Sequence, residues 1–196
     1  MKSKRIFDLC TSLLLILIVS PVLISVAIII SLSGNPPIYR GKRIGLNGRM
    51  FDCYKFTSMN DISTLPIETQ NNILKELHTK GHMKNDPRVT KFGEWIRKTS
   101  IDELPQLFNV LFGSMSLVGP RPISQYEIDK YGKKIEYYKK SIPGITGIWQ
   151  VSGRDEIKYK RRVAMDILYY KKGCLYFDLF ILLKTPAVVF KMSGVN

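Results

Sequence analysis

The chain is short of acidic residues and of cysteines, and each shortage argues against a class of protein. Its 16 Asp and Glu residues face 30 Lys and Arg residues, which leaves a net charge of +14. A surplus of this size indicates an anionic partner, and nucleic acid, anionic lipid headgroups and phosphorylated substrates all meet that requirement. The three cysteines, Cys10, Cys53 and Cys174, are far apart and form no Cys-x-x-Cys pair. This spacing argues against a disulfide framework or a zinc knuckle and fits reduced thiols.

Internal repeats and low-complexity segments are also missing. A hydrophobic share of 45% argues against a wholly disordered chain. With 196 residues, the chain has the length of one domain with a real core.

One long segment near the start lacks charge altogether. No charged residue occurs from Leu9 to Tyr39, and residues 13–32 are almost continuously aliphatic. That run has the roughly 20 residues needed to cross a bilayer. It is longer than the core of a signal peptide and has no small-x-small cleavage site near its end, so we expect residues 1–36 to form a membrane helix.

Two features of this segment indicate that it enters and leaves by the same leaflet. Basic residues flank both ends, at positions 2–5 and 40–43, and the positive-inside rule places both flanks in the cytoplasm. Proline removes a backbone donor, so Ser20-Pro21 predicts a break, where the Ser20 hydroxyl can satisfy a freed carbonyl. A kinked helix that spans the membrane is the alternative.

The remaining residues, 37–196, are expected to form a mainly helical α+β domain at the membrane surface. Asn47-Gly48 predicts a small β-hairpin. Apolar spacing and breaker residues predict helices over 68–78, 89–98, 104–112, 123–140 and 158–170. The apolar stretch 175–192 follows a basic run, so it is either an amphipathic helix in the membrane interface or a buried core helix.

Ser100-Ile101-Asp102-Glu103 contains two adjacent carboxylates that are candidates for a catalytic site. It matches a capping box, in which Ser100 accepts from the Glu103 amide and Glu103 bonds back to Ser100. Pro105 instead favours a helix that starts at Asp102. In either register the positive helix end favours ionised carboxylates, which suit a metal ligand or a nucleophile.

Basic residues in rigid turns surround this carboxylate pair. Arg97 precedes it, Arg121 and Pro122 lie in a Gly-Pro-Arg-Pro turn, and Arg154 follows Gly153. Guanidinium groups held in such turns are suited to grip phosphate oxygens. Carboxylates, arginines and glycine-rich turns together predict a site for a metal-bound diphosphate.

The order and spacing of several motifs resemble the bacterial sugar transferases, the monotopic phosphoglycosyl transferases, from end to end. The motifs are KRIFDL, Ser20-Pro21, YRGKRIGLNGRMF, CYKFTSM, NDPRVTKFGEWIRKTSIDELPQLFNVL, GSMSLVGPRP and PGITGIWQVSGR. The resemblance implies a re-entrant helix broken at Ser20-Pro21. It also implies the minimal form of the family, without additional spanning helices.

For the site, the resemblance implies that Asp102 and Glu103 are the catalytic dyad and candidate Mg²⁺ ligands. Asp102 would attack the β-phosphate of a UDP-sugar, release UMP and form an aspartyl-phosphosugar, which undecaprenyl phosphate then attacks. Arg97 and Arg121 would hold phosphate oxygens. The family often has a basic residue where this chain has Thr57, which leaves Lys55 as the nearer phosphate contact.

The resemblance further implies the cytoplasmic face of the bacterial inner membrane, anionic lipid as a partner and no nucleic acid. The product would start a surface glycan. A homodimer and downstream glycosyltransferases are the protein partners that fit this role. The sugar, the glycan pathway, the oligomeric state and the role of residues 61–84 stay open. The competing hypothesis is a basic membrane-tethered binding or scaffold protein without catalysis.

Overall fold

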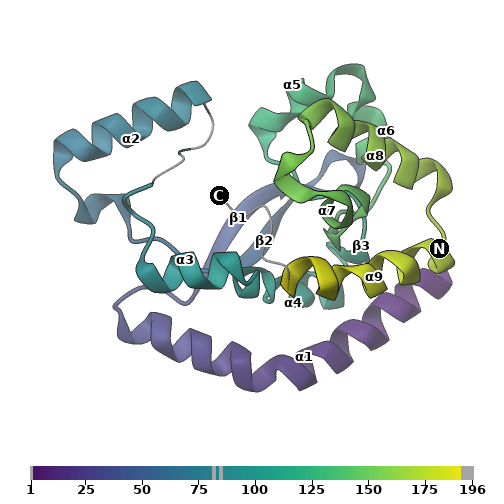
Figure 1. Cartoon of the computed structure of the whole chain (residues 1–196), viewed down its shortest axis with the longest axis horizontal. Helices are drawn as coiled ribbons and strands as arrows, with labels where there is room; N and C mark the ends of the chain where they lie inside the picture. The colour runs from purple at the N-terminus through teal and green to yellow at the C-terminus, as the bar shows by residue number, and fades with distance from the viewer. Residues whose placement is uncertain (1, 81–82, 84–85, 191–196) are drawn as a thin grey trace.

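A computed structural model describes residues 2–80, 83 and 86–190 of the chain. The predicted class, mainly helical with one small hairpin, is confirmed (Figure 1). The α-helices are α1 (Lys2–Leu32), α2 (Ile67–Lys80), α3 (Lys91–Lys98), α4 (Gln106–Phe112), α5 (Ile128–Tyr131), α6 (Ile135–Lys139), α7 (Ile148–Ser152), α8 (Tyr159–Lys172) and α9 (Leu175–Phe190). The strands are β1 (Ile38–Ile44), β2 (Met50–Phe56), β3 (Ser116–Val118) and β4 (Gly144–Thr146). Short 3₁₀ turns are η1 (Leu46–Gly48), η2 (Ile62–Thr64), η3 (Ile101–Glu103), η4 (Gln125–Glu127), η5 (Gly132–Lys134) and η6 (Arg154–Glu156).

The helix α1 bends at Ser20-Pro21 and is not interrupted there, so the sequence was right about the position of the irregularity and wrong about a full break. Helical structure continues through Pro21 to Leu32. Pro21 cannot donate to the carbonyl four residues earlier, that of Leu17, and the Ser20 hydroxyl donates to that same carbonyl at 2.8 Å. The dipeptide therefore bends the helix without ending it, and Figure 1 shows α1 changing direction near its middle.

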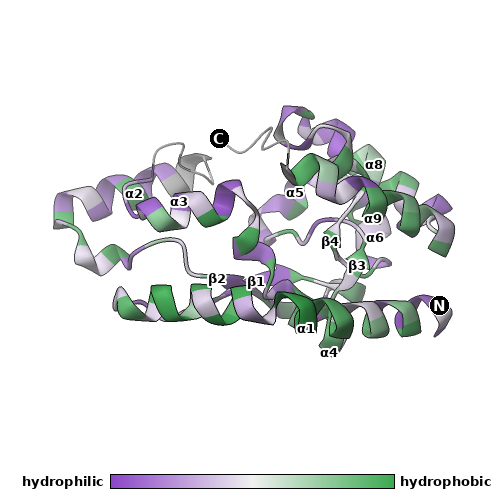
Figure 2. Ribbon diagram, turned by 60° about the horizontal axis from the view of Figure 1, so that its bottom comes forward, coloured by the Kyte–Doolittle hydropathy of each residue, from purple (hydrophilic) through white to green (hydrophobic). Residues whose placement is uncertain are grey.

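The burial pattern of α1 differs from that of a soluble amphipathic helix, because its exposed face is apolar. Its buried residues include Asp8 and Ser12, whereas its large aliphatic side chains are mostly exposed. The exposed ones are Ile6, Leu9, Leu13, Leu14, Leu17, Ile18, Val22, Ile24, Ile28, Ile29 and Leu32. In Figure 2 the ribbon of α1 is green, that is, hydrophobic, along most of its length. The buried face thus includes two polar residues near the start of α1 and Val26 and Ile30 near its end, whereas the outer face is mostly apolar. An exposed apolar face of this length fits a helix whose outer side meets lipid.

Charged residues in the first turns of α1 fasten it to the rest of the fold. Arg5 donates to the carbonyls of Val110 and Leu111, at 2.6 and 2.8 Å, and so satisfies two carbonyls in the last turn of α4. Asp8 accepts from the Ser116 hydroxyl and the Leu117 amide, at 2.8 and 3.2 Å. The candidate membrane helix α1, α4 and β3 are therefore held together by polar bonds at one end of the molecule.

Lys4 makes an ion pair with Asp178 of α9, and this pair predicts a large effect on stability. Asp178 is only 1% exposed and also accepts from the Tyr169 hydroxyl at 2.7 Å. Replacing Lys4 by Met leaves a buried carboxylate without its cation, so we expect the free energy of unfolding to fall by about 3 kcal/mol. Denaturant unfolding in detergent micelles measures this change.

The matched control for this prediction is Lys42→Met. Lys42 is 68% exposed and pairs with Asp52 on the hairpin surface, so its loss should cost less than about 1 kcal/mol. Equal losses in the two variants would show that the Lys4–Asp178 pair does not fasten α1 to α9.

The predicted hairpin is confirmed, and it is antiparallel with Ile44 opposite Met50. Asn47 and Gly48 both have positive φ, 57° and 75°, as a tight turn between twisted strands requires. A second small sheet was not predicted from the sequence: β3 pairs with β4 in parallel. There Gly119 and Gly144 approach so closely that a Cβ on Gly144 would lie 2.0 Å from the Gly119 nitrogen. This contact joins the Gly-Pro-Arg-Pro turn to the Pro-Gly-Ile-Thr-Gly turn.

The predicted helices are confirmed in part. Those over 68–78, 89–98, 104–112 and 158–170 correspond to α2, α3, α4 and α8. The single helix expected over 123–140 is wrong, because Gly132 takes a φ of +52° and separates α5 from α6.

The α9 helix combines the two alternatives predicted for residues 175–192, an amphipathic helix in the membrane interface and a buried core helix. Ile181 is buried in the core, whereas Tyr176 and Leu183 are more than four-fifths exposed. The helix therefore has one face in the core and an apolar outer face. The last two residues of the predicted helix lie outside the described residues.

Candidate active site

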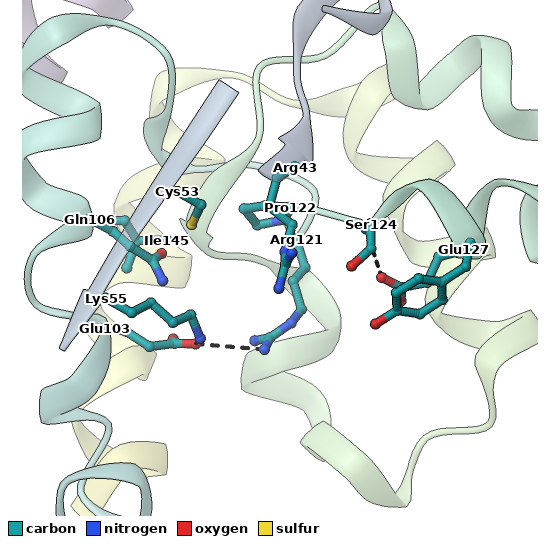
Figure 3. A pocket seen from close by; sticks show the side chains of 11 residues that line it. Arg43, Cys53, Lys55, Glu103, Gln106, Arg121, Pro122, Ser124, Glu127 and Ile145 are labelled. Atoms are coloured by element: carbon teal, nitrogen blue, oxygen red, sulfur yellow. Dashed lines mark hydrogen bonds and ion pairs between the residues drawn. The ribbon is translucent and has the colours of Figure 1, made fainter. Parts of the chain in front are cut away.

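A cavity of about 200 Å³ opens between the hairpin, α4 and the turn that follows β3. It is lined by Arg43, Cys53, Lys55, Glu103, Gln106, Arg121, Pro122, Ser124, Tyr126, Glu127 and Ile145. Figure 3 shows the side chains of Lys55, Glu103 and Arg121 converging on one another from three separate segments. The cavity therefore collects basic and acidic groups that are far apart in the sequence.

The carboxylate pair lies in the 3₁₀ turn η3, and its local structure differs from a capping box. Ser100 adopts a left-handed conformation with φ of 59°, and its side chain makes no capping bond. Pro105 stands between this turn and α4, where its missing amide is tolerated. Asp102 is buried, at 7% exposure. Glu103 lines the cavity, whereas Asp102 lies beside it.

Lys55 links the two carboxylates. Its Nζ lies 2.6 Å from Glu103 Oε1 and 3.8 Å from Asp102 Oδ2. Arg121 approaches the same Glu103 oxygen, with Nη2 at 3.6 Å. Glu103 therefore has two cationic neighbours, Lys55 and Arg121. The Lys55 ammonium lies closer to Glu103 than to Asp102.

These surroundings shift the two carboxyl pKa values in opposite directions. Burial raises the pKa of Asp102 to about 6, and the nearby Lys55 charge opposes that rise only in part. Burial also acts against an ionised Glu103, but Lys55 and Arg121 outweigh it and lower the pKa of Glu103 to about 2. At Asp102, burial therefore opposes the ionised form that the sequence predicts for both residues.

Comparison with known proteins finds similarity along almost the whole chain. The bacterial sugar transferase family matches residues 1–192. The chain belongs to this family. Among curated relatives, the undecaprenyl-phosphate galactose phosphotransferase of Salmonella typhimurium is 44% identical over 202 residues, covering 97% of this chain and 41% of the relative.

Two further relatives of this sugar transferase have related names. The UDP-glucose:undecaprenyl-phosphate glucose-1-phosphate transferase of Escherichia coli is 39% identical, over 93% of this chain and 39% of the relative. The exopolysaccharide production protein ExoY of Sinorhizobium fredii is 42% identical, over 95% of this chain and 85% of the relative. The chain thus spans about two fifths of the length of several relatives and most of ExoY.

The basic residues predicted for the site are only partly assembled by the fold of this sugar transferase. Lys55, Arg121 and Pro122 line the cavity. Arg97 does not line it, although its charge lowers the pKa of Asp102. Arg154 also lies outside the lining, but its charge lowers the pKa of Glu103.

Arg154 contacts the turn that carries the carboxylate pair. Its Nη2 donates to the Ser100 hydroxyl at 3.1 Å, and both residues have positive φ, 48° and 59°. Its Nη1 is buried and has no hydrogen-bond partner among the described residues. Strained backbone and a buried unpartnered donor beside the carboxylates are typical of a binding site.

Sequence reasoning missed most of the far side of the cavity. Arg43 is brought there because Ile44 pairs with Ile123, and the Tyr138 hydroxyl donates to the Ile44 carbonyl at 2.8 Å. Gln106, four residues after Asp102, could have been found from helical spacing. Ser124, Tyr126 and Glu127 carry no comparable signal, since only the folded turn brings them to the cavity.

Proposed function

We propose that the chain transfers a sugar-1-phosphate from a UDP-sugar to undecaprenyl phosphate through a covalent intermediate on Asp102, with release of UMP. The observation that carries this proposal is the pairing of a buried Asp102, whose pKa is raised, with a Glu103 that Lys55 and Arg121 keep ionised. The names of the relatives supply the two substrates.

The first half-reaction assigns the attack to Asp102. A carboxylate whose pKa is about 6 is mostly ionised at neutral pH and is more basic than an ordinary aspartate. One of its oxygens forms a bond to the β-phosphorus of the UDP-sugar. The bond from that phosphorus to the bridging oxygen breaks, and the electron pair leaves with UMP.

The basic residues stabilise the negative charge of the diphosphate during this step. Lys55 and Arg121 line the cavity beside Glu103, and donors in fixed positions stabilise charge that develops on departing phosphate oxygens. The buried Nη1 of Arg154 is a further donor for a phosphate oxygen. Glu103 holds Lys55 in place through their 2.6 Å contact.

Magnesium fits the residues present. Asp102 and Glu103 supply carboxylate oxygens, and no group of three or more His, Cys, Asp or Glu side chains occurs among residues 2–80, 83 and 86–190 that could form a cage of its own. Mg²⁺ characteristically binds through one or two carboxylates and completes its shell with substrate phosphates and water. When bound, it would neutralise diphosphate charge.

The second half-reaction takes place at the membrane surface. An oxygen of undecaprenyl phosphate attacks the phosphorus of the aspartyl-phosphosugar, the bond to Asp102 breaks, and the carboxylate is restored. The apolar outer face of α1 and the bend at Ser20-Pro21 support a re-entrant helix on the cytoplasmic face of the inner membrane. Product formed there would start a surface glycan.

Release of UMP in the absence of acceptor tests this proposal. Protein in nanodiscs, given Mg²⁺ and UDP-galactose or UDP-glucose, should release about one UMP per active site and gain the mass of one sugar phosphate. Added undecaprenyl phosphate should convert this burst into turnover. A folded protein that releases no UMP with any UDP-sugar, and binds anionic lipid only, would support the scaffold hypothesis instead.

A further inference from the structure

A second cavity, of about 110 Å³, lies against the last turns of α1 and shares no lining residue with the first. It is lined by Ile29, Ile30, Ser33, Asn35, Thr57, Met59, Thr90 and Phe92. Figure 1 shows α3, which contributes Phe92, lying over the C-terminal half of α1. Half of the lining is apolar, and the polar half comes from hydroxyl and amide side chains without formal charge.

Packing links this second cavity both to the outer side of α1 and to the turn that carries the carboxylate pair. Ile29 is 45% exposed on the outer side of α1 and also lines the cavity. Ile30 and Phe92 pack in one cluster with Ile101, the residue that precedes Asp102. A chain that leaves the bilayer beside Ile29 therefore lies close to the turn that carries Asp102.

Thr57 contributes a hydroxyl group to the lining of the second cavity. Its hydroxyl is buried and has no hydrogen-bond partner among the described residues. Thr57 is two residues beyond Lys55, so one segment of chain lines both cavities. Leaving a buried hydroxyl unpaired is costly, and a ligand oxygen placed there would remove that cost.

We infer that this second cavity holds the one isoprene unit of the acceptor lipid nearest its phosphate, with the Thr57 hydroxyl donating to an oxygen of the phosphate group. The inference rests on the proposed function, which supplies the acceptor. A cavity of roughly 150 Å³ lined by aliphatic and aromatic side chains holds one benzene molecule, so a cavity of about 110 Å³ has room for a branched five-carbon unit. The rest of the polyprenyl chain then follows the apolar face of α1 into the bilayer.

Filling the second cavity from the α1 side tests the inference. In Ile29→Trp, the KM for undecaprenyl phosphate should rise about ten-fold, equivalent to about 1.4 kcal/mol of lost lipid contact. The acceptor-free UMP burst should not change, since Ile29 is outside the first cavity. Ile24→Trp is the matched control: Ile24 is 60% exposed on the same helix, does not line the cavity, and should leave the KM for the lipid unchanged.

Thr57→Val separates a lost lipid contact from a folding defect. Removing a buried, unpaired hydroxyl should raise the unfolding temperature, while the KM for undecaprenyl phosphate should rise about three-fold or more, in line with the loss of one hydrogen bond. Equal acceptor KM values in wild type and Thr57→Val would contradict the hydroxyl contact. Equal KM values in Ile29→Trp and Ile24→Trp would overturn the cavity assignment.

Photolabelling identifies the occupant directly. Undecaprenyl phosphate with a diazirine in its first isoprene unit should label Met59 or Phe92. Labelling of these residues only by a diazirine phospholipid would assign the cavity to bulk lipid and overturn the inference. A wild-type protein without a UMP burst would contradict the proposed function itself, and a normal burst with unchanged acceptor kinetics would contradict only the second cavity.

Discussion

Asp102→Asn should abolish the covalent intermediate and reduce turnover by at least about 10⁴-fold, as loss of a nucleophile does in other covalent enzymes. The amide has nearly the same shape as the carboxylate but cannot form the acyl phosphate. Because burial already disfavours the charged form of Asp102, a neutral replacement should leave the fold intact. Intact-protein mass spectrometry and UMP release, both without acceptor, measure the effect.

The matched control is Asp129→Asn, the same substitution at an exposed position in α5. It should retain the UMP burst and the mass increase of the wild type. A phosphosugar adduct that still forms on the Asp102→Asn protein would remove Asp102 from the nucleophile role and direct attention to Glu103.

Lys55→Met should have the second largest effect, a loss of about 10² to 10³-fold in the rate of the UMP burst, comparable to removal of one donor from an oxyanion site. Lys55 is the cation nearest to Glu103, at 2.6 Å, and it lies 3.8 Å from Asp102. The methionine chain fills similar space but carries no charge. Burst rates measured by rapid quench would determine the loss.

The pH dependence of the burst rate should also change in Lys55→Met, and the direction of the change follows from the pKa of Asp102. Asp102 acts in its ionised form, so the burst rate in the wild type should rise with pH through about 6. Lys55 lowers the pKa of Asp102, and its removal should therefore move the midpoint of this rise to higher pH. Lys42→Met, on the neighbouring strand, should keep the wild-type midpoint. A midpoint that does not move in Lys55→Met would show that Lys55 does not act on the charge of Asp102.

Opposite pKa shifts in adjacent carboxyl groups suggest how the two residues divide their roles. Glu103 lies against two cations and stays ionised over the physiological range, and in the proposed mechanism it positions Lys55. Asp102 is buried beside that pair and is less well neutralised. A group that is both ionised at neutral pH and relatively basic is the better nucleophile of the two.

The sequence by itself determined the features that depend on local order. The uncharged run from Leu9 to Tyr39 predicted a long apolar helix able to enter a membrane, because transfer of an unbroken apolar segment into lipid depends on composition alone. Asn47-Gly48 predicted the hairpin, because positive φ at two adjacent residues favours these residue types. The family was evident from motif order. Glu103 and Arg121 were named from local motifs and Lys55 from the resemblance, and all three line the cavity.

Only the tertiary structure decided how those residues act on one another. Lys55 and Glu103 are 48 positions apart, and no local pattern gives their 2.6 Å contact. The rise in the pKa of Asp102 depends on what covers it, and the continuity of α1 past Pro21 depends on the Ser20 hydroxyl reaching the Leu17 carbonyl. The second cavity, with the unpaired Thr57 hydroxyl, exists only where α1, α3 and the hairpin meet. Burial, charge pairing and cavities arise from contacts between distant segments, and such contacts are properties of the fold and not of any one stretch of sequence.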